Sequence, residues 1–152
     1  MLILLPPSES KAVPRRGRPL DLTNLSFSEL TGARGRVLDA LVSLTGRDDA
    51  ADVLGIGATQ SDLVALDARL RTSPTVRAEL LYSVLYDALG LTTLKPAAHR
   101  RATTRTAVVS SLFGLVRPGD RLPSYRLSGD VNLPGLGSVA GGVARGPRAG
   151  RP

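Results

Sequence analysis

The chain has 152 residues, of which 42% are hydrophobic and 22% charged, a composition typical of one soluble domain with its own core. It contains no cysteine and a single histidine, His99. Disulfides, thiol-based peroxide reduction and cysteine-ligated metal sites are therefore excluded. The formal net charge is +7, from 20 basic and 13 acidic residues. This excess permits a nucleic-acid partner without requiring one.

The chain opens with the apolar run Met1–Leu5, which no basic residue precedes. A run this short is neither a signal peptide nor a membrane span. We predict that Leu2–Leu5 forms a strand buried on both faces. We also expect a cytoplasmic monomer with no membrane partner. Residues 8–25 are polar and rich in proline and arginine, which predicts a long loop.

Helical spacing of apolar residues dominates the middle of the chain and predicts helices over 26–44, 49–54 and 61–71. The pair Ser73-Pro74 has the residue types that open a helix, and Gly90 has the type that ends one. We therefore predict a further helix between them.

The last part of the chain has weaker patterns. Ala107–Val109 predicts a second buried strand, and residues 118–138 are rich in glycine and proline with little helical pattern. Strands separated by several helices predict an α/β (α+β) fold whose sheet is incomplete. We expect one domain over 1–138 and a disordered tail over 139–152, where glycine, arginine, alanine and proline predominate.

Three segments carry a family resemblance. They are Leu4–Ala12, Glu79–Leu91 and Ser110–Gly137. The third has an apolar-aromatic-glycine turn followed by Arg-Pro and then Tyr-Arg-Leu, and together the segments resemble the YaaA-type peroxide stress proteins. The resemblance implies a YaaA-like domain, a role in peroxide stress linked to intracellular iron, and DNA binding through a helix-hairpin-helix element.

Two features depart from that family pattern. Family members are usually longer, and the resemblance here ends near Ser138, before a tail whose residue types have GC-rich codons. We therefore expect a truncated or frameshifted chain. In addition, Val84 stands where the family pattern has a glycine after Tyr82 and Ser83.

The first candidate site is the glycine turn Leu54–Gly57, which resembles a helix-hairpin-helix. In that motif, backbone amides at the start of the second helix face a DNA phosphate and position the duplex without reading its sequence. A plain turn between two helices remains the alternative. The predicted contacts with double-stranded DNA are Gly55, Ile56, Gly57, Thr59, Gln60 and Ser61, flanked by the cations Arg15, Arg16, Arg100 and Arg101.

The second candidate site is an anion or ligand pocket that follows the first strand. Its predicted residues are Ser8, Lys11, Arg117, Tyr125 and Arg126. A serine–lysine nucleophile pair is conceivable, but no oxyanion hole or second acid/base group accompanies it. We therefore predict no enzymatic activity, no catalytic residue, no cofactor and no metal. A small-anion-binding protein or enzyme, and a non-functional fragment, remain the alternatives to DNA binding.

Three further residues have simpler expectations. An Arg117–Asp120 pair is expected to fix the loop that contains it. Tyr125 either stacks on a base or fills the core. His99 has no partner at ligand spacing and is expected to lie on the surface.

Overall fold

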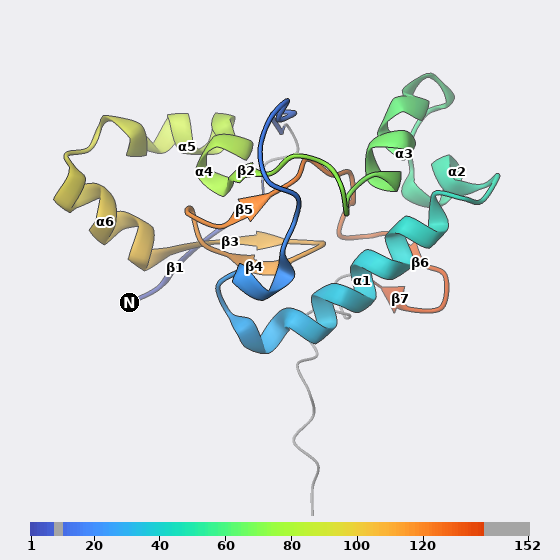
Figure 1. The fold of residues 1–152 in the computed structure, drawn as a ribbon, viewed down its shortest axis with the longest axis horizontal. Helices are drawn as coiled ribbons and strands as arrows, with labels where there is room; N and C mark the ends of the chain where they lie inside the picture. Colours follow the sequence, from blue (N-terminus) through green and yellow to red (C-terminus); the bar gives the residue numbers. More distant parts are fainter. Residues whose placement is uncertain (8–10, 139–152) are drawn as a thin grey trace, which may run out of the picture.

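The computed structural model of the chain describes residues 1–7 and 11–138 (Figure 1). Helices surround three small sheets, which confirms the mixed α/β class. The tail predicted over 139–152 lies outside the described residues, as does Ser8.

The largest sheet joins the two strands that the sequence predicts. Its order is β1 (Ile3–Leu5), β3 (Thr106–Ser110) and β4 (Gly114–Val116), with β1 parallel and β4 antiparallel to β3. Two smaller antiparallel ladders pair β2 (Val76–Arg77) with β5 (Arg121–Leu122), and β6 (Asn132–Leu133) with β7 (Gly137–Ser138).

The prediction that the first strand is buried on both faces is wrong. Ile3 is 44% exposed and Leu4 55% exposed, and Val109 in β3 is also exposed. Strand β1 lies at the edge of the sheet, where it pairs only with β3 among the described residues, and the described elements leave the side chains of Ile3 and Leu4 largely uncovered. The apolar run therefore predicted the strand correctly but did not predict whether other elements pack over it.

The predicted helix over 26–44 is present as α1 (Thr31–Leu44), preceded by the 3-10 turns η1 (Leu22–Asn24) and η2 (Ser28–Leu30). Its buried face carries the apolar side chains Val37, Leu38, Leu41 and Leu44, and its two glycines do not interrupt it. Next come α2 (Ala50–Leu54), η3 (Ala58–Gln60) and α3 (Ser61–Ala68), at the predicted positions.

The single helix predicted between Ser73-Pro74 and Gly90 is wrong. Strand β2 is followed by α4 (Ala78–Leu81) and α5 (Ser83–Leu89), which break at Tyr82. Non-local hydrogen bonds outcompete the helix: the Ala78 amide donates to the Asp120 carbonyl at 2.7 Å. Gly90 does end α5, with the left-handed φ of 65° expected of a helix-terminating glycine.

Helix α6 (Pro96–Arg105), which follows η4 (Leu91–Thr93), was not predicted from the pattern of apolar residues. None of its residues is buried, so it lacks the apolar stripe by which an amphipathic helix is recognised. Pro96 at its first turn fits a helix start. In Figure 1, α6 lies at one end of the long axis, and α2 and α3 lie at the other.

Candidate functional site

The glycine corner, residues 55–61, is a tight turn between α2 and α3. Gly55 ends α2 with a φ of 69°, which favours glycine. The Gly55 amide donates to the Asp52 carbonyl at 3.1 Å, and the Ile56 amide donates to the Ala51 carbonyl at 2.9 Å. These two amides therefore close the end of α2 and are not available to a phosphate, so the predicted contact depends on the amides at the start of α3.

The outer surface of the glycine corner is open. Gly55, Gly57, Thr59, Gln60 and Ser61 are all exposed. A Cβ placed on Gly55 would meet no heavy atom within 4 Å. Ile56, in contrast, is only 5% exposed, so its side chain belongs to the core and cannot contact DNA.

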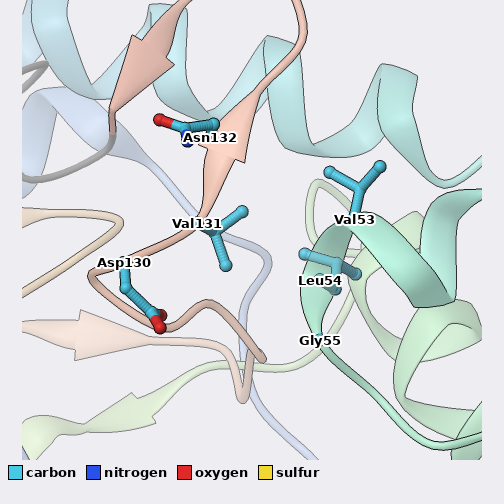
Figure 2. A pocket seen from close by; sticks show the side chains of 6 residues that line it. All are labelled: Val53, Leu54, Gly55, Asp130, Val131 and Asn132. Atoms are coloured by element: carbon cyan, nitrogen blue, oxygen red, sulfur yellow. The ribbon is translucent and has the colours of Figure 1, made fainter.

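Acidic residues lie on the segments that adjoin the same corner. Asp130 lines a hollow of about 320 Å³ together with Gly55 and the end of α2 (Figure 2). Asp52 and Asp62 are exposed on the helices before and after the turn, and Asp62 lies in the first turn of α3. An acid there already complements the helix dipole. The corner thus supplies accessible backbone but no positive charge of its own, and the structure does not confirm a helix-hairpin-helix.

The positive charge lies elsewhere. Arg100, Arg101 and Arg105 are exposed on α6, at the end of the molecule opposite α2 and α3 (Figure 1). Arg15 and Arg16 are exposed in the loop after β1. Opposite ends of the molecule cannot seat one phosphate, so the predicted DNA contacts form separate surfaces.

The loop that carries Arg15, Arg16 and Arg18, called the arginine loop below, is fixed by hydrogen bonds between its backbone and Thr75. The amide and hydroxyl of Thr75 both donate to the Arg18 carbonyl, at 2.9 and 2.7 Å. Gly17 has a φ of 147°, and a Cβ there would lie 2.2 Å from the Thr75 carbonyl oxygen. Only glycine fits this close approach, which fixes the base from which the flanking arginines project.

The second candidate site is only partly assembled as predicted. The Lys11 ammonium lies over the Tyr125 ring, 4.4 Å from its centroid. Arg117 points away: its Nη1 donates to the Thr104 carbonyl at 2.7 Å, and its guanidinium lies 4.9 Å from the centroid of the Phe27 ring. Ser8 lies outside the described residues. Lys11 and Tyr125 therefore meet, and Arg117 does not join them.

Tyr125 fills the core rather than facing solvent. It is 3% exposed, and its hydroxyl bonds the Tyr82 hydroxyl at 2.6 Å and Ser110 Oγ at 2.7 Å. Phe113 packs against the Tyr125 ring edge to face, with centroids 5.5 Å apart. Desolvation by burial raises the pKa of both tyrosines, so both stay neutral near pH 7.

Asp67 on α3 completes this region and was not anticipated. It is fully buried, and its Oδ1 accepts the Arg126 amide at 2.8 Å. Burial raises the pKa of Asp67 to about 7, opposed by the Arg126 amide and by the charges of Lys11 and Arg126. The sequence did contain a signal: Asp67 follows Leu63 by four and precedes Leu70 by three, so it shares the apolar face of the helix predicted over 61–71.

Two smaller expectations also change. Asp120 does fix its loop, but through the Arg117 amide at 2.9 Å and through Ser26, whose amide and hydroxyl both donate to Asp120 Oδ1. His99 is partly buried rather than a free surface residue, since its Nε2 lies 2.9 Å from Glu79 Oε2. Among the described residues, no group of three or more His, Asp or Glu side chains is close enough to hold a metal ion.

The family of the chain follows from its similarity to known proteins. The family model described as peroxide stress protein YaaA matches residues 1–140. The chain belongs to this family. Among its relatives, a UPF0246 protein of Corynebacterium efficiens is 51% identical over 136 residues, which cover 89% of this chain and 54% of the relative. Another, from Streptomyces coelicolor, is 48% identical over 142 residues, covering 91% of this chain and 55% of the relative.

A more distant relative extends the YaaA comparison. An uncharacterised protein of Campylobacter jejuni is 29% identical over 130 residues, covering 83% of this chain and 52% of the relative. The chain thus spans about half the length of these curated relatives. No helix in the described ranges 1–7 and 11–138 has both the length and the apolar character needed to cross a bilayer.

Proposed function

We propose that this chain is a non-enzymatic, cytoplasmic, monomeric member of the peroxide stress family that binds double-stranded DNA without sequence specificity. In that role it limits the damage linked to intracellular iron. The basic surface of α6 makes the main contact with the phosphate backbone. The arginine loop and the glycine corner make secondary contacts along the duplex.

The observation that supports this proposal most strongly is the charge of α6. Its arginines, Arg100, Arg101 and Arg105, are exposed, and Lys95 precedes them. The chain contains no acidic residue from Ala88 to Gly119. Arg101 and Arg105 lie one helical turn apart on the same face. Exposed cations without neighbouring acids along the chain attract phosphates and release counterions, which gives affinity that depends on salt and not on base sequence.

The glycine corner has a lesser part in the proposal than its sequence suggests. Its exposed backbone around Gly57 can approach a phosphate closely, which supports a contact. The nearby Asp52, Asp62 and Asp130 oppose a phosphate electrostatically. The corner therefore positions DNA that α6 and the arginine loop already hold.

The test compares two double variants by electrophoretic mobility shift of a duplex over a range of salt. Arg100→Gln/Arg101→Gln removes two charges from α6, and we expect the log–log salt dependence to fall by about two. The matched control, Arg36→Gln/Arg69→Gln, removes two exposed charges elsewhere, and we expect affinity within about twofold of the wild type. Equal losses in both variants would show that only net charge matters, which contradicts a defined surface.

A third variant isolates the glycine corner. Gly57 has a φ of −67°, and a Cβ there comes no closer than 4.0 Å to a neighbour, so Gly57→Glu is compatible with the fold. If the corner touches DNA, the added carboxylate weakens binding severalfold at low salt. Unchanged binding would show that the glycine corner does not contact DNA, and the contact through α6 would still stand.

A further inference from the structure

The strongest unexplained feature is a polar cluster formed by Lys11, Asp67, Tyr82, Ser110, Tyr125 and Arg126. It gathers side chains from five separate segments of the chain. Strands β1 and β3 are parallel, Ser110 ends β3, and Lys11 follows the end of β1. Ligands of open α/β sheets bind outside the carboxyl ends of parallel strands. The polar cluster therefore occupies the edge of the sheet at which a ligand is expected.

One wall of the polar cluster is internally satisfied. The Tyr125 hydroxyl bridges Tyr82 and Ser110, and Ser110 Oγ in turn accepts the Phe113 amide at 3.1 Å. These groups have partners, and the ring of Tyr125 supports the Lys11 ammonium. This wall holds Lys11 in place, so it serves as a rigid support rather than as a set of ligand contacts.

The other wall is not satisfied. Asp67 Oδ2 and Arg126 Nε are both buried, and neither has a hydrogen-bond partner among the described residues. Leaving such groups unpaired in a protein interior is unfavourable, so each occurrence calls for an explanation. The two residues are neighbours, because the Arg126 amide binds Asp67 Oδ1. These two neighbouring residues therefore each keep one polar atom whose hydrogen-bonding capacity is unused.

The chemistry of these groups defines what binds. Arg126 Nε and the Lys11 ammonium are hydrogen-bond donors, and a protonated Asp67 presents a third donor at Oδ2. A partner must then bring acceptor atoms and negative charge. We propose that Lys11, Asp67 and Arg126 bind the phosphate or carboxylate group of a small molecule. This small-oxyanion site uses none of the residues proposed to contact DNA, and its binding does not depend on DNA binding.

A pH dependence follows from the groups that face Asp67. Burial keeps Tyr82 and Tyr125 neutral near pH 7 and raises the pKa of Asp67 to about 7, so Asp67 changes its protonation between pH 6 and 8. An ionised Asp67 repels an anion, and a neutral Asp67 donates to it. Anion binding is therefore expected to be about tenfold tighter at pH 6 than at pH 8.

The experiment is calorimetric titration of the whole chain with sulfate, inorganic phosphate and acetate at pH 6 and 8. Sulfate keeps its charge throughout, so its pH dependence reports the protein alone. Phosphate against acetate distinguishes a tetrahedral from a planar ligand group. We expect saturable binding of at least one probe, weakened at least tenfold by Lys11→Met and by Arg126→Gln. Arg36→Gln removes one positive charge from an exposed position on α1, outside both proposed sites, and leaves binding within about twofold.

Asp67→Asn provides the readout that a purely structural role would not produce. Asparagine keeps an acceptor for the Arg126 amide and a donor for the ligand, so binding persists while its pH dependence disappears. The proposal is overturned if no probe binds at tens of millimolar, if Arg36→Gln weakens binding as much as Lys11→Met, or if Asp67→Asn keeps the wild-type pH dependence. Circular dichroism confirms that each variant is folded, and should Arg126→Gln fail that check, Lys11→Met decides.

Discussion

Arg34 is the side chain whose replacement should affect the fold most. It lies on α1 with no exposed surface, and its guanidinium donates to four backbone carbonyls. Two of these belong to Phe113 and Leu115 on the β3–β4 hairpin, at 2.7 and 2.6 Å from Nε and Nη2. The other two belong to Ser26 and Phe27, before α1. Arg34 thus connects the helix, the loop before it and the main sheet.

The expected cost follows from those contacts. Burial lowers the pKa of Arg34, opposed by the charges of Asp120 and Glu29, but the group stays protonated near neutral pH. Arg34→Met keeps much of the volume and leaves carbonyl groups without their donor. Hydrogen bonds to a charged group contribute about 1.5–3 kcal/mol each, and part of that is regained because the charge no longer has to be buried. We expect a net loss of about 3–5 kcal/mol, or roughly 10–15 °C in Tm.

The assay is urea and thermal unfolding followed by circular dichroism. Arg36→Met, at an exposed position two residues along the same helix, is the matched control and should change stability by less than about 0.5 kcal/mol. Arg34→Lys should lose most of the stability too, because an ammonium cannot reproduce the fork of a guanidinium. If Arg34→Met unfolds within about 1 kcal/mol of the wild type, the guanidinium does not hold these elements together.

Three further outcomes can be measured on the same chain. Gly17→Ala should destabilise it by more than about 1 kcal/mol in urea unfolding, because its Cβ would meet the Thr75 carbonyl; an unchanged midpoint would refute that packing. The folded-state pKa of Asp67, about 7, exceeds its unfolded value, so the folded state binds more protons and this group's stabilisation falls as pH rises from about 4 to 7. Asp67→Asn should remove that loss. Relative to the wild type, the free energy of unfolding of the variant should therefore increase by about 1.4 kcal/mol per pH unit in that range; parallel curves of stability against pH would contradict this. Leu4→Lys should cost less than about 0.5 kcal/mol in urea, since Leu4 is 55% exposed, and a large loss would mean that β1 is covered.

Local patterns predicted most elements of the fold but not their partners. The apolar spacing of Val37, Leu38 and Leu41 identified α1, and the run Ala107–Val109 identified β3. Both depend on side chains within a few residues of one another. Strand β2 could not be found this way, because Val76 pairs with Leu122, far along the chain. The segment around Val76 has a helical pattern, but pairing with a strand distant in the sequence makes it a strand.

In the candidate sites, too, local patterns identified single residues but not the distant residues that they contact. The glycine turn was located correctly, but the carboxylate of Asp130 beside it comes from a segment that no local pattern connects to α2. The sequence predicts that Lys11 and Tyr125 belong to one site, whereas only the tertiary structure brings Asp67 near them. A charged residue on an apolar helix face, as with Asp67 and Arg34, is a signal that a sequence can give. Its partners must come from the structure.

Fluorescence anisotropy of a labelled duplex at 50 and 200 mM salt tests whether the exposed arginines bind DNA through its phosphate backbone, as we propose. With about six phosphates neutralised by α6 and the arginine loop, affinity should fall by about a thousandfold over that range, and equally for unrelated sequences. No binding at 50 mM salt, or binding that is indifferent to salt, would contradict the claim.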